Sequence, residues 1–116
     1  MTSAFDASIL ETVKKSIGLY NISVYDEVLI NDINMVFTRL NQLGVGPEEV
    51  YAIDDDSNTW DEFVTSNSMS LIIPYMCKKV QMLFDAPENT NLTNVINKQL
   101  EELEFCMIAE FDNDET

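Results

Sequence analysis

The chain has 116 residues, 46% of them hydrophobic, and its 21 acidic residues outnumber 6 basic ones, which gives a formal net charge of -15. This length fits one domain with a single modest core, and the apolar content excludes an acidic disordered tail as a description of the whole chain. The negative charge argues against ordinary nucleic-acid binding, whose affinity comes mainly from Lys and Arg, and against contact with anionic membranes.

Only 3 glycines and 3 prolines are present, too few for the frequent turns of a β-sandwich or barrel, so long helices are expected. Ser8 and Glu11 have the spacing of a capping box and predict a helix start. Leu10, Val13 and Ile17 then fall on one helical face, and Gly18 ends the segment. Residues 19–25 are expected to form a connector.

The strongest helical pattern covers residues 26–43. Asp26 and Glu27 lie at its positively polarised start, Arg39 lies near its end, and Gly44 follows as a stop signal. The apolar residues of this segment repeat at helical spacing and form one stripe: Leu29, Ile33, Val36, Phe37, Leu40 and Leu43.

Residues 44–58 lack periodicity and predict an exposed acidic loop, with a short strand around residues 50–53 as an alternative. Thr59 and Glu62 form a second capping-box pattern, which predicts a short helix over Trp60, Phe63 and Val64. Trp60 is expected either to anchor the core or to lie at an interface, and the sequence favours neither use.

The next helix is expected over residues 69–84. Pro74 leaves two possibilities, a long helix with a kink or a helix that begins near residue 73. Residues 85–89 form a turn, and the last helix is predicted over residues 92–108. The expected fold is all-α, a compact bundle of four to five helices with a long acidic loop between the second and third. Residues 1–116 form one domain, with a core at 8–108 and a flexible acidic tail at 109–116.

No motif predicts catalysis, a cofactor or a metal site. The chain has no histidine, and therefore lacks the commonest general base and transition-metal ligand. Cys77 and Cys106 have no CxxC spacing and are expected to be free thiols in a reducing compartment. The three acids at 54–56 are consecutive, whereas calcium loops space their ligands at alternate positions, so a solvated loop is the better interpretation. We therefore expect a protein that is not an enzyme.

Acidic residues gather in two stretches, residues 47–62 and 101–116, and neither stretch contains Lys or Arg. Two interpretations stay open: these are solvated faces, or they are surfaces that repel DNA or meet a basic partner. The candidate residues for a channel-facing or partner-facing surface are Glu48, Glu49, Asp54, Asp55, Asp56, Glu101, Glu102 and Glu104.

Three stretches together resemble the small head-tail connector proteins of tailed phages. They are INMVFTRLNQLGVGP at 33–47, VQMLFDAP at 80–87 and NKQLEELEF at 97–105. Their order and spacing, and the Thr59-Trp60 helix start between them, are also similar to the family. The resemblance covers residues 9–108, which is nearly the whole chain.

The resemblance implies a virion protein, made in the cytoplasm of the bacterial host, that forms a ring of about twelve copies at the head-tail interface. Its partners would be copies of itself, the portal protein and a tail-completion or stopper protein, and DNA would pass through without specific binding. The candidate portal or ring contacts are Trp60, Phe105, Met107 and Phe111.

A second hypothesis from the charge alone is an acidic DNA mimic that inhibits a host nucleic-acid-binding protein. A membrane role is not expected. No charged-then-apolar leader is seen, and no apolar run approaches the roughly 18 residues that a membrane-spanning helix needs.

Overall fold

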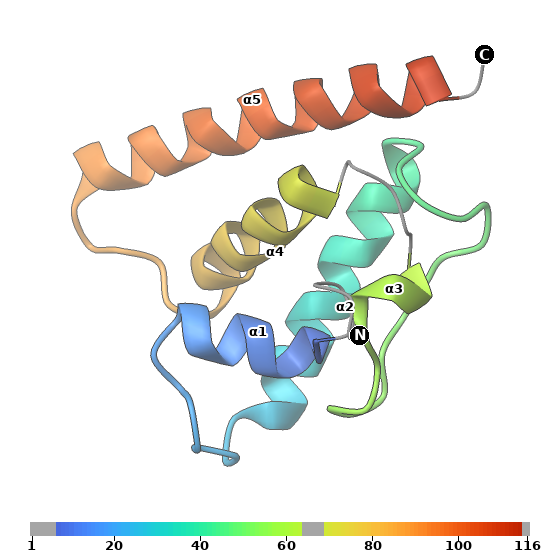
Figure 1. Cartoon of the computed structure of the whole chain (residues 1–116). Helices are drawn as coiled ribbons and strands as arrows, with labels where there is room; N and C mark the ends of the chain where they lie inside the picture. Colours follow the sequence, from blue (N-terminus) through green and yellow to red (C-terminus); the bar gives the residue numbers. More distant parts are fainter. Residues whose placement is uncertain (1–6, 64–68, 115–116) are drawn as a thin grey trace.

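A computed structural model describes residues 7–63 and 69–114 of the chain, with side chains described as far as residue 110. All regular structure in these ranges is helical, and the elements are arranged as in Figure 1. The expected all-α fold is therefore confirmed. In chain order the helices are α1 (Ile9–Ser16), α2 (Asp26–Gln42), α3 (Trp60–Phe63), α4 (Met69–Phe84) and α5 (Thr90–Asp114).

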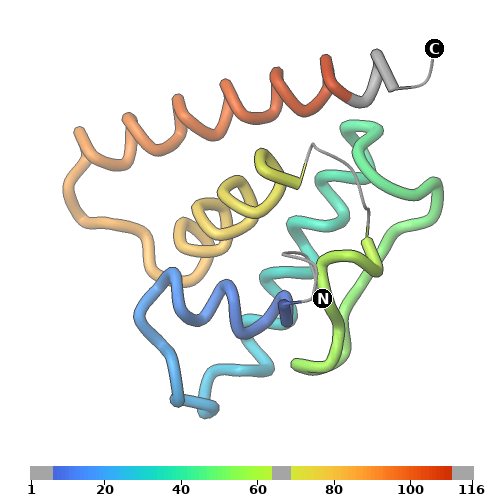
Figure 2. Tube along the Cα trace, viewed as in Figure 1, coloured from blue at the N-terminus to red at the C-terminus, as the bar shows by residue number. Residues whose placement is uncertain are grey.

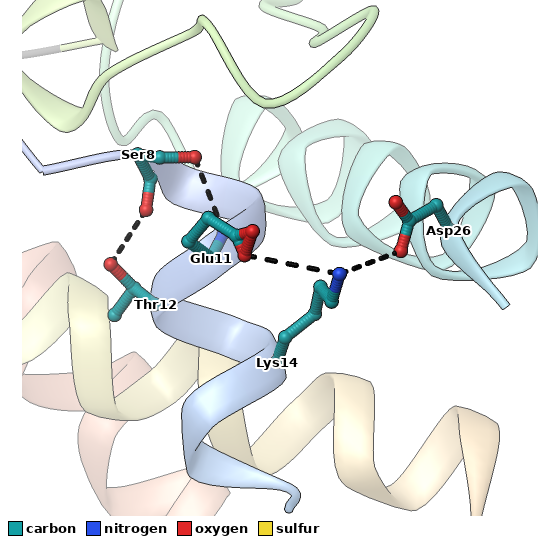
Figure 3. Close-up of polar contacts among 5 residues, drawn as sticks. All are labelled: Ser8, Glu11, Thr12, Lys14 and Asp26. Carbon is teal, nitrogen blue, oxygen red and sulfur yellow. Dashed lines mark hydrogen bonds and ion pairs between the residues drawn. The ribbon is translucent and has the colours of Figure 1, made fainter. Parts of the chain in front are cut away.

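Helix α1 begins at the predicted cap. The hydroxyl of Ser8 accepts a hydrogen bond from the backbone N–H of Glu11 at 3.2 Å, and the hydroxyl of Thr12 donates to the Ser8 carbonyl at 2.7 Å (Figure 3). These bonds stabilise groups that the first turn of a helix leaves without helical partners. The helix ends at Ser16, and Gly18 follows with a φ of 81°.

Helix α2 agrees closely with its prediction, because it ends at Gln42 and the backbone N–H of Leu43 still bonds to Arg39 at 3.1 Å. Gly44 follows with a φ of 80°, in the left-handed region that glycine adopts without strain. The residues of its apolar stripe that are fully buried are Leu29, Ile33, Val36, Phe37 and Leu40.

Helix α4 lies at the centre of the packing, with α1, α2 and α5 all in contact with it (Figures 1 and 2). The helix runs without interruption through Pro74, so the alternative start near residue 73 is wrong. Pro74 itself is exposed. The residues that α4 buries against its neighbours are Met69, Ile72, Tyr75, Met76 and Val80.

Helix α5 is longer than predicted at both ends. The side chain of Asn89 accepts a hydrogen bond from the N–H of Leu92 at 3.0 Å, which fixes the start at Thr90. The helix continues to Asp114, so the expected end near residue 108 is wrong. It lies across the top of the molecule in Figure 1 and buries only Leu100 and Met107 fully among its described side chains.

Residues 43–59 connect α2 to α3, and no strand forms at residues 50–53. The side chain of Asn34 holds this segment, because it accepts from the N–H of Ile53 at 2.8 Å and donates to the Ile53 carbonyl at 3.1 Å. Ile53 and Val45 are buried and fix the path of the loop on the core.

Helix α3 begins after Thr59 as predicted. However, the hydroxyl of Thr59 donates to the carboxylate of Asp61, whereas in a capping box it would accept from the N–H of Glu62. The N–H of Glu62 bonds to the Thr59 carbonyl at 3.1 Å. Val64, which was expected to belong to this helix, lies outside the described residues. None of the described helices combines the length and the apolar character that crossing a membrane requires.

Candidate assembly surfaces

The predicted acids of the 43–59 loop all lie on the surface. Glu48 and Glu49 are exposed beside the end of α2, where the side chain of Asn41 donates to the Glu48 carbonyl at 3.0 Å. Asp54, Asp55 and Asp56 are also exposed and form a turn. In the described part of the chain, no three carboxylates or thiols gather in a way that would hold a metal ion.

The turn at residues 54–58 is ordered by its own side chains. The amide oxygen of Asn58 accepts from the N–H of Asp54 at 2.9 Å, and the carboxylate of Asp55 accepts from the N–H of Ser57 at 2.8 Å. Hydrogen bonds from the Ser57 hydroxyl and N–H lower the pKa of Asp55 below its usual value. The turn therefore presents three exposed carboxyl groups to solvent.

The acids of α5 divide between two sides of the helix. Glu101 and Glu102 are exposed, whereas Glu104 faces the body of the protein. Its carboxylate accepts a hydrogen bond from the Tyr75 hydroxyl at 2.6 Å and forms an ion pair with Arg39 at 3.1 Å. Glu104 therefore joins α5 to both α4 and α2, and its charge is balanced within the chain.

The environment of Glu104 favours its charged form. Burial raises the pKa of its carboxyl, but the hydrogen bonds from Tyr75 and Arg39 and the charge of Arg39 outweigh that effect, so the pKa lies below its usual value. The same contacts raise the pKa of Arg39, chiefly through the hydrogen bond to Glu104. The group is therefore ionised and paired at neutral pH.

A second internal ion pair joins α1 to α2. Lys14 is only 3% exposed, and its ammonium lies 3.0 Å from the carboxylate of Asp26 and 3.8 Å from that of Glu11 (Figure 3). Lys14 and Arg39 are two of the 6 basic residues, and both are neutralised inside the chain. Few positive charges remain to offset the acidic surface.

The four predicted contact residues do not lie together on the surface. Trp60 is fully buried, and its indole N–H donates to the Thr12 hydroxyl at 3.1 Å. Met107 is fully buried as well, so both are core residues of the single chain. Phe105 is 75% exposed and remains a candidate contact, and the side chain of Phe111 lies outside the described residues.

Sequence analysis missed an apolar patch on the connector between α1 and α2. The ring of Tyr25 packs edge-on against Phe84 of α4, with 5.4 Å between centroids, and Lys15 lies 5.2 Å above the ring of Tyr20. The only sequence signal for this patch was a run of apolar residues without helical spacing in the connector. The exposed side chains of this patch are Tyr20, Ile22, Val24 and Tyr25 on the connector, and Val28 in the first turn of α2.

Two adjoining hollows along α4 were also not predicted. One, of about 310 Å³, lies between α4 and α5, and the other, of about 220 Å³, lies between α4 and the end of α1. Pro74 and Lys78 line both hollows. Cys106 lines the first and Cys77 the second, and both thiols are free as expected. Burial raises the pKa of the Cys77 thiol despite a hydrogen bond with Ser16 and the charge of Lys78, which disfavours a reactive thiolate.

Comparison with known proteins adds one finding that covers almost the whole chain. Residues 9–114 match the model of a protein family described as "Phage connector protein". No curated protein and no solved structure gives a significant match. The matched range contains the five described helices, the acidic stretch 47–62, the acidic stretch 101–116 as far as residue 114, and both ion pairs described above. The chain belongs to the phage connector protein family.

Proposed function

We propose that this protein is a structural component of the virion that joins the DNA-filled head to the tail. In this role it forms a ring of about twelve copies beneath the portal protein, with a tail-completion or stopper protein below it. The observation that carries the proposal is the family match over residues 9–114. The role requires no catalysis and no cofactor.

The surface charge supports the passage of DNA through such a ring. Exposed carboxylates lie on both the 43–59 loop and α5, while Lys14 and Arg39 are neutralised internally. A channel lined by carboxylates repels the phosphate backbone, so DNA would move through it without adhering. At least one of the two acidic stretches therefore faces the channel in the proposed ring.

The carboxy-terminal part of α5 is the proposed contact with the portal protein. Phe105 is 75% exposed there, and a large exposed aromatic side chain in an acidic helix fits a docking role. A chain that ends at residue 108 keeps Leu100 and Met107, the buried residues among the described side chains of α5, together with the Glu104 contacts. It should fold normally and bind the portal protein more weakly.

Deleting the gene from the phage tests the proposal. The expected result is DNA-filled heads and free tails that do not join, with infectivity restored when the protein is supplied from a plasmid. Electron microscopy of the lysate distinguishes heads from complete particles. Complete, infectious particles without the protein would contradict the proposed function. Early arrest of phage replication, before any heads form, would favour the DNA-mimic hypothesis.

A further inference from the structure

The two hollows along α4 form one groove with an apolar wall and one central cation. Pro74, Leu103 and Cys106 line the part between α4 and α5, and Lys78 is common to both parts. We call this feature the α4 groove. Its lining combines apolar side chains with polar ones and with two charged residues, Lys78 and Glu102. Lys78, which is common to both parts, and the apolar side chains fit a peptide segment that carries a carboxylate and an apolar side chain.

Lys78 has no ion-pair partner among the residues that the structure describes. Glu102 lines the same hollow, but its carboxylate lies beyond ion-pair distance. Lys78 is only partly exposed, so part of its hydration is already lost. A carboxylate brought to this position would therefore interact more strongly than one at a fully exposed lysine.

The 43–59 loop offers a segment of matching chemistry. Glu48 and Glu49 are exposed and, within the described chain, neither carboxylate pairs with a cation, while Val50 beside them is 51% exposed. The segment is also held in place. Asn41 donates to the Glu48 carbonyl, and the ring of Tyr51 packs against Phe37 with 5.0 Å between centroids. A prearranged segment loses little conformational freedom on binding.

We propose that the α4 groove of one copy receives residues 48–50 of a second copy, with Val50 against the apolar wall and the Glu48 and Glu49 carboxylates near Lys78. This inference rests on the proposed function, because it identifies the contact between neighbouring copies in the ring. Groove and loop are different surfaces of the chain, and repeating such a head-to-tail contact closes a ring when the rotation permits.

The arrangement of the elements supports this choice. In Figure 1 the loop lies beside the end of α2, whereas the end of α1 that borders the groove lies on the other side of the molecule. Two copies with a net charge of -15 repel each other over most of their surfaces. A contact that places carboxylates on a cation without a partner reduces this repulsion where the copies meet.

A charge swap tests the contact in the assembled head. Lys78→Glu alone, and Glu48→Lys with Glu49→Lys, should each reduce the amount of protein bound to purified heads by at least about ten-fold, because each creates like charges at the interface. The variant with all three changes should recover most of the binding. Lys98→Glu is the matched control on an exposed face of α5 and should have little effect. Circular dichroism shows whether each variant is folded.

Cross-linking provides a second measurement that does not depend on Lys78. Cys106 is a native thiol in the groove, so Val50→Cys should allow a short bismaleimide to link neighbouring copies into a ladder of oligomers. Replacing both groove thiols, Cys106→Ser with Cys77→Ser, should abolish the ladder. No ladder in head-bound protein, or a triple charge variant that binds no better than Lys78→Glu, would overturn the inference. If the wild-type protein does not bind heads at all, the proposed function is contradicted together with this inference.

Discussion

Arg39 on α2 and Glu104 on α5 form an ion pair of 3.1 Å, although they are 65 positions apart in the sequence. Tyr75 of α4 donates to the other carboxylate oxygen of Glu104 at 2.6 Å. Helix α5 buries only two of its described side chains fully, so this polar contact is an important part of its attachment. Three helices thus meet at one carboxylate.

Replacing Glu104 by Gln should destabilise the protein by about 1–3 kcal/mol, because it removes the charge that Arg39 and Tyr75 both contact. Urea unfolding followed by circular dichroism measures this change. Glu101→Gln is the control, since Glu101 is exposed on the same helix, and it should change stability by less than about 0.5 kcal/mol. Equal effects of the two substitutions would show that the contact does not hold α5.

The same residue predicts a dependence of stability on pH. Because the pKa of Glu104 is lower in the folded protein than its ordinary value of 4.5, the unfolded chain takes up the proton more readily. The stabilisation is therefore fully present above about pH 4.5 and is lost as the pH falls through the folded pKa. The free energy of unfolding should be measured at several values between pH 3 and 6. As the pH falls, it should decrease less steeply for Glu104→Gln than for the wild type. The same pH dependence of stability in both proteins would contradict the lowered pKa of Glu104.

Two glycines provide a matched pair for a test of packing. Gly46 has a φ of 96°, and a Cβ atom built on it lies 2.5 Å from Cζ of Phe63, whereas Gly18 has a φ of 81° and free space around it. Gly18→Ala should cost about 1 kcal/mol from backbone strain alone. Gly46→Ala should lower the free energy of unfolding by at least about 1 kcal/mol more than Gly18→Ala. The reason is that the Phe63 ring packs against Phe37, with 4.7 Å between ring centroids, and has little room to move. Similar unfolding midpoints for the two variants would contradict this packing.

The buried ion pair between α1 and α2 predicts a coupled effect. Lys14→Met should destabilise the protein by about 1–3 kcal/mol, because Asp26 then keeps its charge without a partner. Lys14→Met combined with Asp26→Asn should recover part of that loss, and a double-mutant cycle measures the coupling. Lys98→Met is the control, as Lys98 is exposed on α5. Strictly additive effects of the two substitutions would show that the pair is not coupled.

Local signals in the sequence predicted most of the helices. Ser8 caps α1 through a residue three positions away, and Gly44 ends α2 with the φ that its type favours, so both features depend only on near neighbours. The end of α5 was predicted too early, because an acidic stretch after residue 108 was interpreted as a flexible tail. The sequence around Pro74 allowed either a long helix through this residue or a helix that begins near residue 73. The choice between them depends on packing against the neighbouring helices, which local sequence does not show.

Surfaces were harder to predict because exposure depends on residues far apart in the chain. Glu104 and Glu102 are both acids of α5, yet only Glu104 faces Arg39, a residue on another helix. Trp60 was equally plausible as a contact or as a core residue until Thr12, 48 positions away, was seen to accept its indole N–H. No local pattern in the sequence indicates that Lys14 is buried, because its partner Asp26 begins a different helix.

Electron cryo-microscopy of the complete particle tests the proposed function most directly. The protein should form a ring of density between the portal protein and the tail, into which the five-helix fold can be placed, with carboxylates of residues 47–62 or 101–116 lining the channel. Copies found elsewhere in the particle, or particles that lack the protein altogether, would contradict the head-tail connector role.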